Sequence, residues 1–214
     1  MKKITLILGA AAIAVSSLSA ASGIFGTGVV ISNNGTSTLY ESTLLGDARH
    51  APNGFTPTLN TVGFNGFNLG TFDTTTSDSL VLNGGSVLTY KNDTDNISGA
   101  SVFYSINGAA FTEITLGFNE DNVNGSGGDQ RWYSEESSVD LLSGLSSGNH
   151  TIAVMYEAPF TYTGGGGGSG THAENNGDSN FTANFTVVPE PGTCALIAGL
   201  FGMTFVALRR RQRN

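Results

Sequence analysis

The chain has 214 residues, of which 12% are charged, and carries a formal net charge of −8. Six of its nine basic residues lie in the first three and last six positions, so residues 22–188 hold three basic residues against sixteen carboxylates, a formal charge of −13. A surface of this sign repels phosphate backbones and attracts cations, which excludes nucleic acid as an expected partner.

The first 21 residues have the pattern of a secretory signal peptide. Lys2 and Lys3 are followed by an apolar stretch over 4–15 and then by the small residues Ser19-Ala20-Ala21. Signal peptidase requires small residues at such positions, so we expect residues 1–21 to be removed after Ala21 and the protein to be exported. The single cysteine, Cys194, lies near the other end, so the exported domain is expected to have no disulfide.

Residues 22–188 are long enough for one domain with its own core, and their apolar residues alternate with polar ones. The clearest element is a hairpin, in which two alternating stretches over 100–106 and 111–118 flank Asn107-Gly108. An Asn-Gly pair favours a two-residue turn because both of its positions need a positive φ.

Other short alternating stretches predict further strands at 28–32, 38–41, 67–72, 80–82, 87–91, 131–133, 139–142, 151–156 and 181–187. Turn residues separate them at intervals near 8 to 12 residues, which is typical of an all-β fold and predicts a single antiparallel β-sandwich of jelly-roll or Ig-like type. Two long loops are expected, over 43–66 and over 159–180. From residue 111 onward the chain loosely resembles a β-sandwich module of bacterial surface proteins, a likeness that implies architecture and no activity.

Motifs associated with catalysis occur in the wrong context. Residues 144–148 match G-x-S-x-G, but a nucleophile elbow needs a strand before it and a helix after it, and here a turn between two strands is expected. His50, His150 and His172 are scattered through turns and are interpreted as surface histidines. No pair of carboxylates can be placed across a cleft, so the protein is predicted not to be an enzyme.

One acidic loop has the oxygen ligands that calcium prefers. Glu120, Asp121, Asn122 and Asn124 are candidate calcium ligands, since their order resembles the start of an EF-hand loop. The resemblance ends at Arg131, where that loop needs a bidentate carboxylate. The alternative is a set of solvated turn residues with no cofactor bound.

The only tryptophan suggests a second kind of site. Trp132 and Tyr133 are candidate glycan contacts, because exposed aromatic rings in sugar-binding sandwiches pack against pyranose rings. The alternative is that Trp132 belongs to the core, as a lone tryptophan in a small domain often does.

The last 26 residues combine three features. They are Pro189-Glu190-Pro191-Gly192, an uncharged stretch over 193–208, and a basic end, 209–214, containing Arg209, Arg210, Arg211 and Arg213. Sixteen residues of helix extend roughly 24 Å, slightly less than the ~30 Å hydrocarbon core of a membrane, so 193–208 is a marginal transmembrane helix. The arginines would stay in the cytoplasm, which places residues 22–188 outside.

This tail resembles the PEP-CTERM sorting tail of Gram-negative bacteria, which is also described on some proteins as an ice-binding protein C-terminal domain. The resemblance covers only residues 189–214. It implies processing by an exosortase, transient anchoring in the inner membrane, and release to the cell surface or an extracellular, exopolysaccharide-rich matrix. A permanent anchor is the alternative use of the same tail.

The predicted function is therefore that of an exported surface or matrix protein without enzymatic activity, whose partners are signal peptidase, an exosortase and exopolysaccharide. A carbohydrate-binding module, supported by calcium or not, is the alternative. Ice binding is disfavoured because Thr74-Thr75-Thr76 is a single cluster and not a repeated array.

Overall fold

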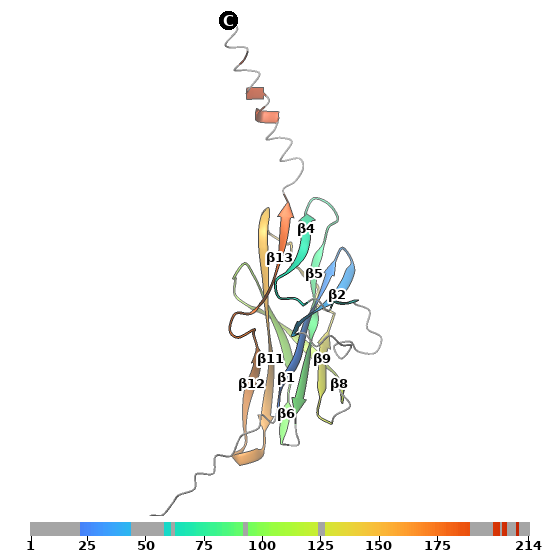
Figure 1. Ribbon diagram of the computed structural model, residues 1–214, viewed down its shortest axis with the longest axis vertical. Coiled ribbons are helices and arrows are strands. Elements are labelled where there is room, and N and C mark those ends of the chain that lie inside the picture. The colour runs from blue at the N-terminus through green and yellow to red at the C-terminus, as the bar shows by residue number, and fades with distance from the viewer. Residues whose placement is uncertain are drawn as a thin grey trace, which may run out of the picture.

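The computed structural model describes residues 22–43, 58–60, 63–91, 94–123, 127–188, 199–201, 203–204 and 209. This part of the chain is almost entirely β-structure, which confirms the all-β prediction (Figure 1). Its strands are β1 (Ser22–Asn33), β2 (Thr36–Thr43), β3 (Thr58–Asn60), β4 (Phe67–Asp73), β5 (Leu80–Lys91), β6 (Asp95–Ile97), β7 (Ala100–Ile106), β8 (Thr112–Asp121), β9 (Gln130–Ser134), β10 (Val139–Asp140), β11 (Gly148–Tyr162), β12 (Gly168–Glu174) and β13 (Phe181–Val188). A short 3-10 turn, η2 (Gly164–Gly166), joins β11 to β12.

Hydrogen bonds connect these strands into one curled sheet. Its path is β3-β2-β1-β5-β9-β8-β7-β11-β13-β4, with β10 added to β5 and with β6 and β12 added to β11. Strand β8 forms the corner, because 112–116 pair with β7 whereas 117–121 pair with β9. The outermost pairs, β2 with β3 and β13 with β4, are parallel, so the expectation of a purely antiparallel sheet is wrong at both edges. The finer prediction of a two-sheet sandwich stays a prediction.

A short segment before β4 joins the two edges of the curled sheet. The backbone N–H of Phe64 donates to the carbonyl of Glu41 in β2 at 2.7 Å, and that of Gly66 donates to the carbonyl of Thr182 in β13 at 2.7 Å. The Phe64 side chain is fully buried, and the rings of Tyr40 and Phe67 lie 4.9 Å apart between their centroids. These backbone hydrogen bonds and aromatic contacts thus connect strands near the two ends of the curled sheet.

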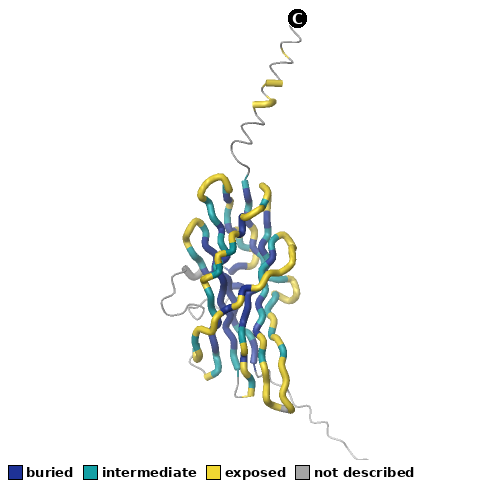
Figure 2. Tube along the Cα trace, turned by 180° about the vertical axis from the view of Figure 1, so that it is seen from behind, coloured by how far each residue is buried: buried dark blue, intermediate teal, exposed yellow. Residues whose placement is uncertain are grey.

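The core lies between the two halves of the sheet. Apolar side chains from β1, β2 and β5 on one half meet those from β7, β11 and β13 on the other, and the buried residues run along the middle of the strands while the turns at both ends are exposed (Figure 2). The hydroxyl groups of Ser42 in β2 and Tyr156 in β11 share a buried hydrogen bond of 2.6 Å across this core. Burial raises the pKa of Tyr156, so its hydroxyl stays protonated in the folded protein.

The predicted hairpin is confirmed. Strands β7 and β8 are antiparallel neighbours, and Asn107 and Gly108 between them have φ values of 53° and 75°. These left-handed conformations are the ones that favour Asn and Gly at the two turn positions.

The predicted break between 80–82 and 87–91 is wrong, because both stretches belong to the single strand β5. Gly84 and Gly85, which lie between the two predicted stretches, serve close packing. Gly84 has φ +144°, and a Cβ there would overlap the carbonyl oxygen of Ser134 in β9. Glycine at this position lets two strands approach without ending either of them.

The predicted loop over 159–180 is also wrong in its first half, where β11 continues to Tyr162 and β12 follows. Gly168 and Gly170 in β12 lie opposite Tyr162 and Phe160 in β11. A Cβ on these glycines would lie within 2.6 Å and 2.8 Å of ring carbons of Tyr162 and Phe160, respectively. The two rings therefore cover the glycine backbone of the neighbouring strand and stabilise a glycine-rich sequence as a strand.

In the tail, the described residues 199–201, 203–204 and 209 are helical, and Leu200, Phe201 and Met203 are exposed. Within the described part of the chain, no helix has both the length and the hydropathy to cross a membrane. Residues 1–21, the motif at 189–192 and most of 193–214 lie outside the described residues, so the signal peptide, the sorting motif and the transmembrane helix stay predictions.

Candidate functional site

Two of the candidate calcium ligands, Glu120 and Asp121, have separate protein partners. Glu120 and Asp121 are adjacent in β8, and neighbouring side chains of a strand point to opposite faces. The Glu120 carboxylate pairs with the buried guanidinium of Arg131, whereas Asp121 accepts a hydrogen bond of 3.1 Å from the Gln130 side chain.

Asn122 follows with φ +61°, and Asn124 lies outside the described residues. Among the residues that the structure describes, no group of three or more His, Cys, Asp or Glu side chains could hold a metal ion. This geometry gives the calcium prediction no support.

The expected glycan contacts differ in exposure. Trp132 is only 8% exposed, and its indole Nε1–H donates to the Thr89 hydroxyl at 3.2 Å. Trp132 is therefore a core residue and does not offer a ring face to a sugar. Tyr133 is half-buried, and its hydroxyl donates to Glu135 at 2.9 Å. Burial, assisted by the Glu135 carboxylate, raises the pKa of Tyr133. Glycan contact by Tyr133 stays a prediction.

Residues 144–148 form the turn between β10 and β11, as expected, and β11 begins at Gly148. His150 is buried, which corrects its interpretation as a surface histidine. Its Nε2 contacts the backbone carbonyl of Ser146 at 2.8 Å, and its Nδ1 contacts the amide of Asn107 at 2.9 Å. Because both ring nitrogens hold neighbouring turns in place, His150 is not positioned to activate a serine hydroxyl. His50 lies outside the described residues.

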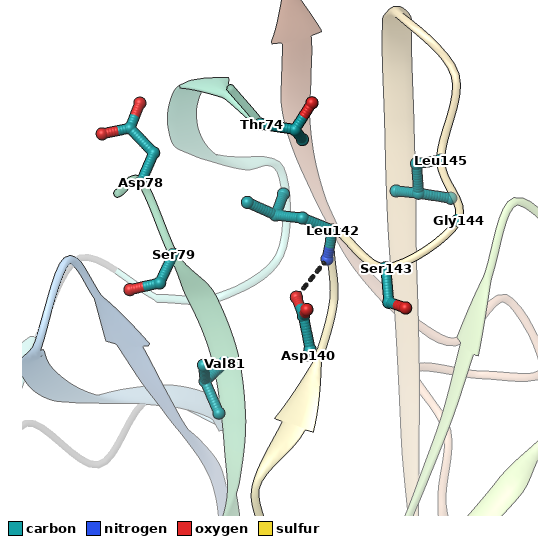
Figure 3. A pocket seen from close by; sticks show the side chains of 9 residues that line it. All are labelled: Thr74, Asp78, Ser79, Val81, Asp140, Leu142, Ser143, Gly144 and Leu145. Atoms are coloured by element: carbon teal, nitrogen blue, oxygen red, sulfur yellow. Dashed lines mark hydrogen bonds between the residues drawn. The ribbon is translucent and has the colours of Figure 1, made fainter. Parts of the chain in front are cut away.

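A depression of about 420 Å³ lies between the β4–β5 turn and the β10–β11 turn (Figure 3). Its lining consists of Thr74, Asp78, Ser79, Val81, Asp140, Leu142, Ser143, Gly144 and Leu145. An oxygen of Asp140 accepts the Leu142 N–H, and an oxygen of Asp78 accepts the Asp73 N–H, each at 2.9 Å. The two carboxylates thus stabilise their own turns. None of the nine lining residues is aromatic, so the depression lacks a surface on which a sugar ring could pack.

At the other end of β11, three strands bring a hydroxyl, a carboxylate and an imidazole together. Ser22, the first residue of β1, donates its hydroxyl to Asp95 Oδ2 in β6 at 2.9 Å. The Ser22 hydroxyl oxygen also lies 2.9 Å from His172 Nε2 in β12. Because the single hydroxyl proton goes to Asp95, the Ser22 oxygen accepts from His172, which assigns a proton to Nε2.

This cluster resembles a catalytic triad in composition but not in geometry. In a triad the carboxylate orients the histidine and the histidine accepts the serine proton, whereas here the carboxylate accepts the serine proton and His172 donates. Ser22 is also only 2% exposed, so its oxygen cannot reach a substrate. The arrangement therefore links three strands and does not provide a nucleophile.

Aromatic rings extend the cluster to the surface. The His172 and Phe160 rings are stacked, with their centroids 4.2 Å apart and an angle of 14° between their planes. The centroid of the Tyr162 ring lies 6.3 Å from that of Phe160, with an interplanar angle of 32°. Tyr162 is 39% exposed and lies directly opposite Asp95 in the register of β11 and β6. A row of three rings thus runs outward and ends beside a carboxylate.

Sequence reasoning missed this arrangement because residues 159–180 were expected to form a loop. The signal was nevertheless present, since Phe160 and Tyr162 continue the alternation of β11, and Gly168, Gly170 and His172 alternate in the same way. Once β12 pairs with β11, these two sets of side chains share one face of the sheet.

Acidification is expected to destabilise the domain through His172. Burial lowers the pKa of His172, although the Asp95 carboxylate opposes the shift. At pH values between the two pKa values the unfolded chain then binds more protons than the folded one. The contribution of neutral His172 to the free energy of unfolding is therefore complete above the ordinary histidine pKa and is lost as pH falls through the lowered pKa. Thermal unfolding at pH 7.5 and pH 5, above the range of most carboxylates, should give a lower Tm at pH 5 and a smaller decrease for His172→Gln. Equal decreases in both proteins would contradict this assignment.

Comparison with protein-family models finds no match for this chain, and comparison with curated proteins finds none either. Nothing is therefore carried over to this chain from a relative, and its function is inferred from its own residues.

Proposed function

We propose that this protein is exported, sorted by its C-terminal tail, and displayed at the cell surface or in the extracellular matrix as a non-enzymatic β-domain. The bounds of the domain are the observation that carries this proposal. Strand β1 begins at Ser22, the residue directly after the predicted signal-peptidase site, and β13 ends at Val188, the residue directly before Pro189. All of the described β-strands thus lie within the segment that would remain once both processing segments were removed.

In this proposal the stretch over 193–208 crosses the inner membrane while Arg209, Arg210, Arg211 and Arg213 remain in the cytoplasm. An exosortase then acts at the Pro189-Glu190-Pro191-Gly192 motif and releases the domain outward. Both halves of the curled sheet contribute to one core and are joined by the Ser42–Tyr156 hydrogen bond, which supports classifying the domain as a β-sandwich of jelly-roll or Ig-like type.

A non-enzymatic role fits the polar groups of the domain. Ser22 is buried, His150 holds two turns, and the carboxylates of Asp78 and Asp140 accept backbone N–H groups. Each of these groups stabilises the fold, which leaves it poorly placed for chemistry on a substrate.

Carbohydrate binding is the second candidate function. It is favoured by the row of rings from His172 to Tyr162, which reaches the surface beside Asp95. Aromatic rings provide packing surfaces for sugars, and carboxylate oxygens accept hydrogen bonds from their hydroxyl groups.

Removal of the tail tests the sorting proposal. A chain that ends at Val188 keeps all of β13 and therefore the complete described domain, but it lacks the proposed anchor. We expect the full chain to be recovered from the envelope and matrix fractions and the shortened chain to be released into the periplasm or medium. Immunoblots of these fractions provide the measurement, and an identical distribution of the two chains would contradict a sorting role for residues 189–214.

A further inference from the structure

We propose that the Tyr162 mouth, formed by Asp95, Phe160, Tyr162 and His172 above the buried Ser22, binds an uncharged polysaccharide chain. This inference rests on the second function proposed above and gives it a location and a ligand class. The site differs from the predicted Trp132 and Tyr133 pair, of which Trp132 is buried.

The ring row continues the inner face of β11 beyond the core. Along this strand Tyr156 and Ala158 are fully buried, Phe160 is half-buried and Tyr162 is 39% exposed. The glycines of β12 opposite Phe160 and Tyr162 carry no side chains, so the rings rest on the neighbouring backbone and are fixed before any ligand arrives. A rigid, partly exposed aromatic surface can bind without a large cost in side-chain entropy.

The polar groups beside these rings suit hydroxyl groups. Asp95 lies opposite Tyr162, and its two oxygens accept hydrogen bonds from Ser22 at 2.9 Å and from Thr94 at 3.0 Å. Each carboxylate oxygen has a second lone pair, so Asp95 is held in position and keeps acceptor capacity. An aromatic surface with a few fixed polar groups at its border is the usual composition of a small-ligand site.

Charge selects an uncharged ligand. Residues 22–188 carry a formal charge of −13, and one of the carboxylates included in this charge, Asp95, lies in the Tyr162 mouth. A polysaccharide with uronate or phosphate groups would be repelled by this net charge on approach, whereas a neutral chain meets no such barrier.

The mouth lies at the opposite end of β11 from the residues that pair with the C-terminal part of β13. In β11, Gly148 at one end pairs with Val187 of β13, and Tyr162 at the other end pairs with Gly168 of β12. The intervening stretch of strand extends roughly 46 Å at about 3.3 Å per residue. Figure 1 shows the β11–β12 turn at the lower end of the domain and the arrowhead of β13 at the upper end. A domain held by its C-terminus would therefore direct the mouth away from the membrane and into surrounding polysaccharide.

Native affinity electrophoresis tests this proposal with the processed protein and two probes. The probes are the neutral and the acidic fractions of the producing bacterium's extracellular polysaccharide, separated by anion exchange and included in the gel. We expect the neutral fraction to retard the protein and Tyr162→Ala to weaken this retardation at least tenfold. Phe111→Ala should leave it unchanged, since Phe111 is 38% exposed and lies outside the mouth. Circular dichroism is the control that checks whether both variants are folded. Tyr162→Phe, which keeps the ring, should retain most of the binding.

Absence of retardation by the neutral fraction, or equal weakening by Tyr162→Ala and Phe111→Ala, would overturn the proposal. Stronger retardation by the acidic fraction would overturn it as well. The sorting function is judged separately by tail removal and fractionation, so a correctly sorted protein that ignores neutral polysaccharide would refute the binding site alone.

Discussion

Replacing Gly85 by alanine is expected to destabilise the domain by about 3 kcal/mol, because the added methyl group has no space in the core. Gly85 of β5 pairs with Val29 of β1, and its α-carbon lies close to the Gly28 carbonyl of β1 and to Val102 of β7 across the core. A Cβ at this position would lie 2.6 Å from the Gly28 carbonyl oxygen and 2.7 Å from Val102 Cγ2. The backbone oxygen belongs to a paired central strand and cannot move without disturbing it, so both halves of the sheet would be pushed apart.

Urea unfolding followed by tryptophan fluorescence measures this effect through Trp132, which lies in the core. The matched control is Gly117→Ala in β8, where the nearest atom to a new Cβ is the Tyr133 carbonyl oxygen at an ordinary 3.5 Å. We expect this control to change the free energy of unfolding by less than about 1 kcal/mol. If the two variants were equally stable, the close packing of β5 against β7 would be incorrect.

Replacing Pro189, Glu190 and Pro191 together by alanine is expected to block removal of the tail almost completely. In the proposed function this motif is the feature that the exosortase acts on, and the domain itself ends before it, at Val188. The variant should therefore fold normally, remain in the membrane fraction and keep its C-terminus. The measurement is cell fractionation followed by immunoblotting, in which the variant should migrate as a larger protein than the unaltered one because it retains the tail.

Glu136→Ala is the control for that variant, because it removes an exposed carboxylate from the domain surface without touching the motif. We expect it to be processed like the unaltered protein. Normal processing of the triple variant would show that the three residues do not direct sorting.

Much of the strand pattern could be predicted from the sequence, since alternation marks a strand with one buried and one exposed face. Ile152, Val154 and Tyr156 are all fully buried, as their alternation in β11 indicates. The turn at Asn107-Gly108 was equally accessible, because few other residue pairs favour two successive positive φ values.

Glycine was the main source of error. In β5 and β12 it marks close contact between a backbone and its neighbours, yet the local sequence has the composition of a turn or loop. The distinction depends on the partner strand, and Gly168 and Gly170 form a strand because Tyr162 and Phe160 cover them. The curl of the sheet at β8 could not be predicted from the sequence for the same reason. A strand that pairs with β7 along one part and with β9 along the other has no distinctive local sequence.

The candidate site depended even more on long-range pairing. Ser22, Asp95 and His172 are separated by 73 and 77 residues in the sequence and meet only because β1, β6 and β12 converge at one end of the domain. Trp132 was the more obvious aromatic residue in the sequence, but its side chain is buried in the core and donates to Thr89. The aromatic residues that reach the surface beside polar groups were found only through the register of β11, β6 and β12.

Mass spectrometry of the protein recovered from envelope and medium fractions, with and without the exosortase of the producing bacterium, tests the central claim most directly. We predict a mature form that begins at Ser22 and ends near Pro189-Glu190-Pro191 when the exosortase is present, and a form that begins at Ser22 and retains the tail when it is absent. A C-terminus that extends through Asn214 in both strains would contradict exosortase sorting and would make residues 189–214 a permanent anchor.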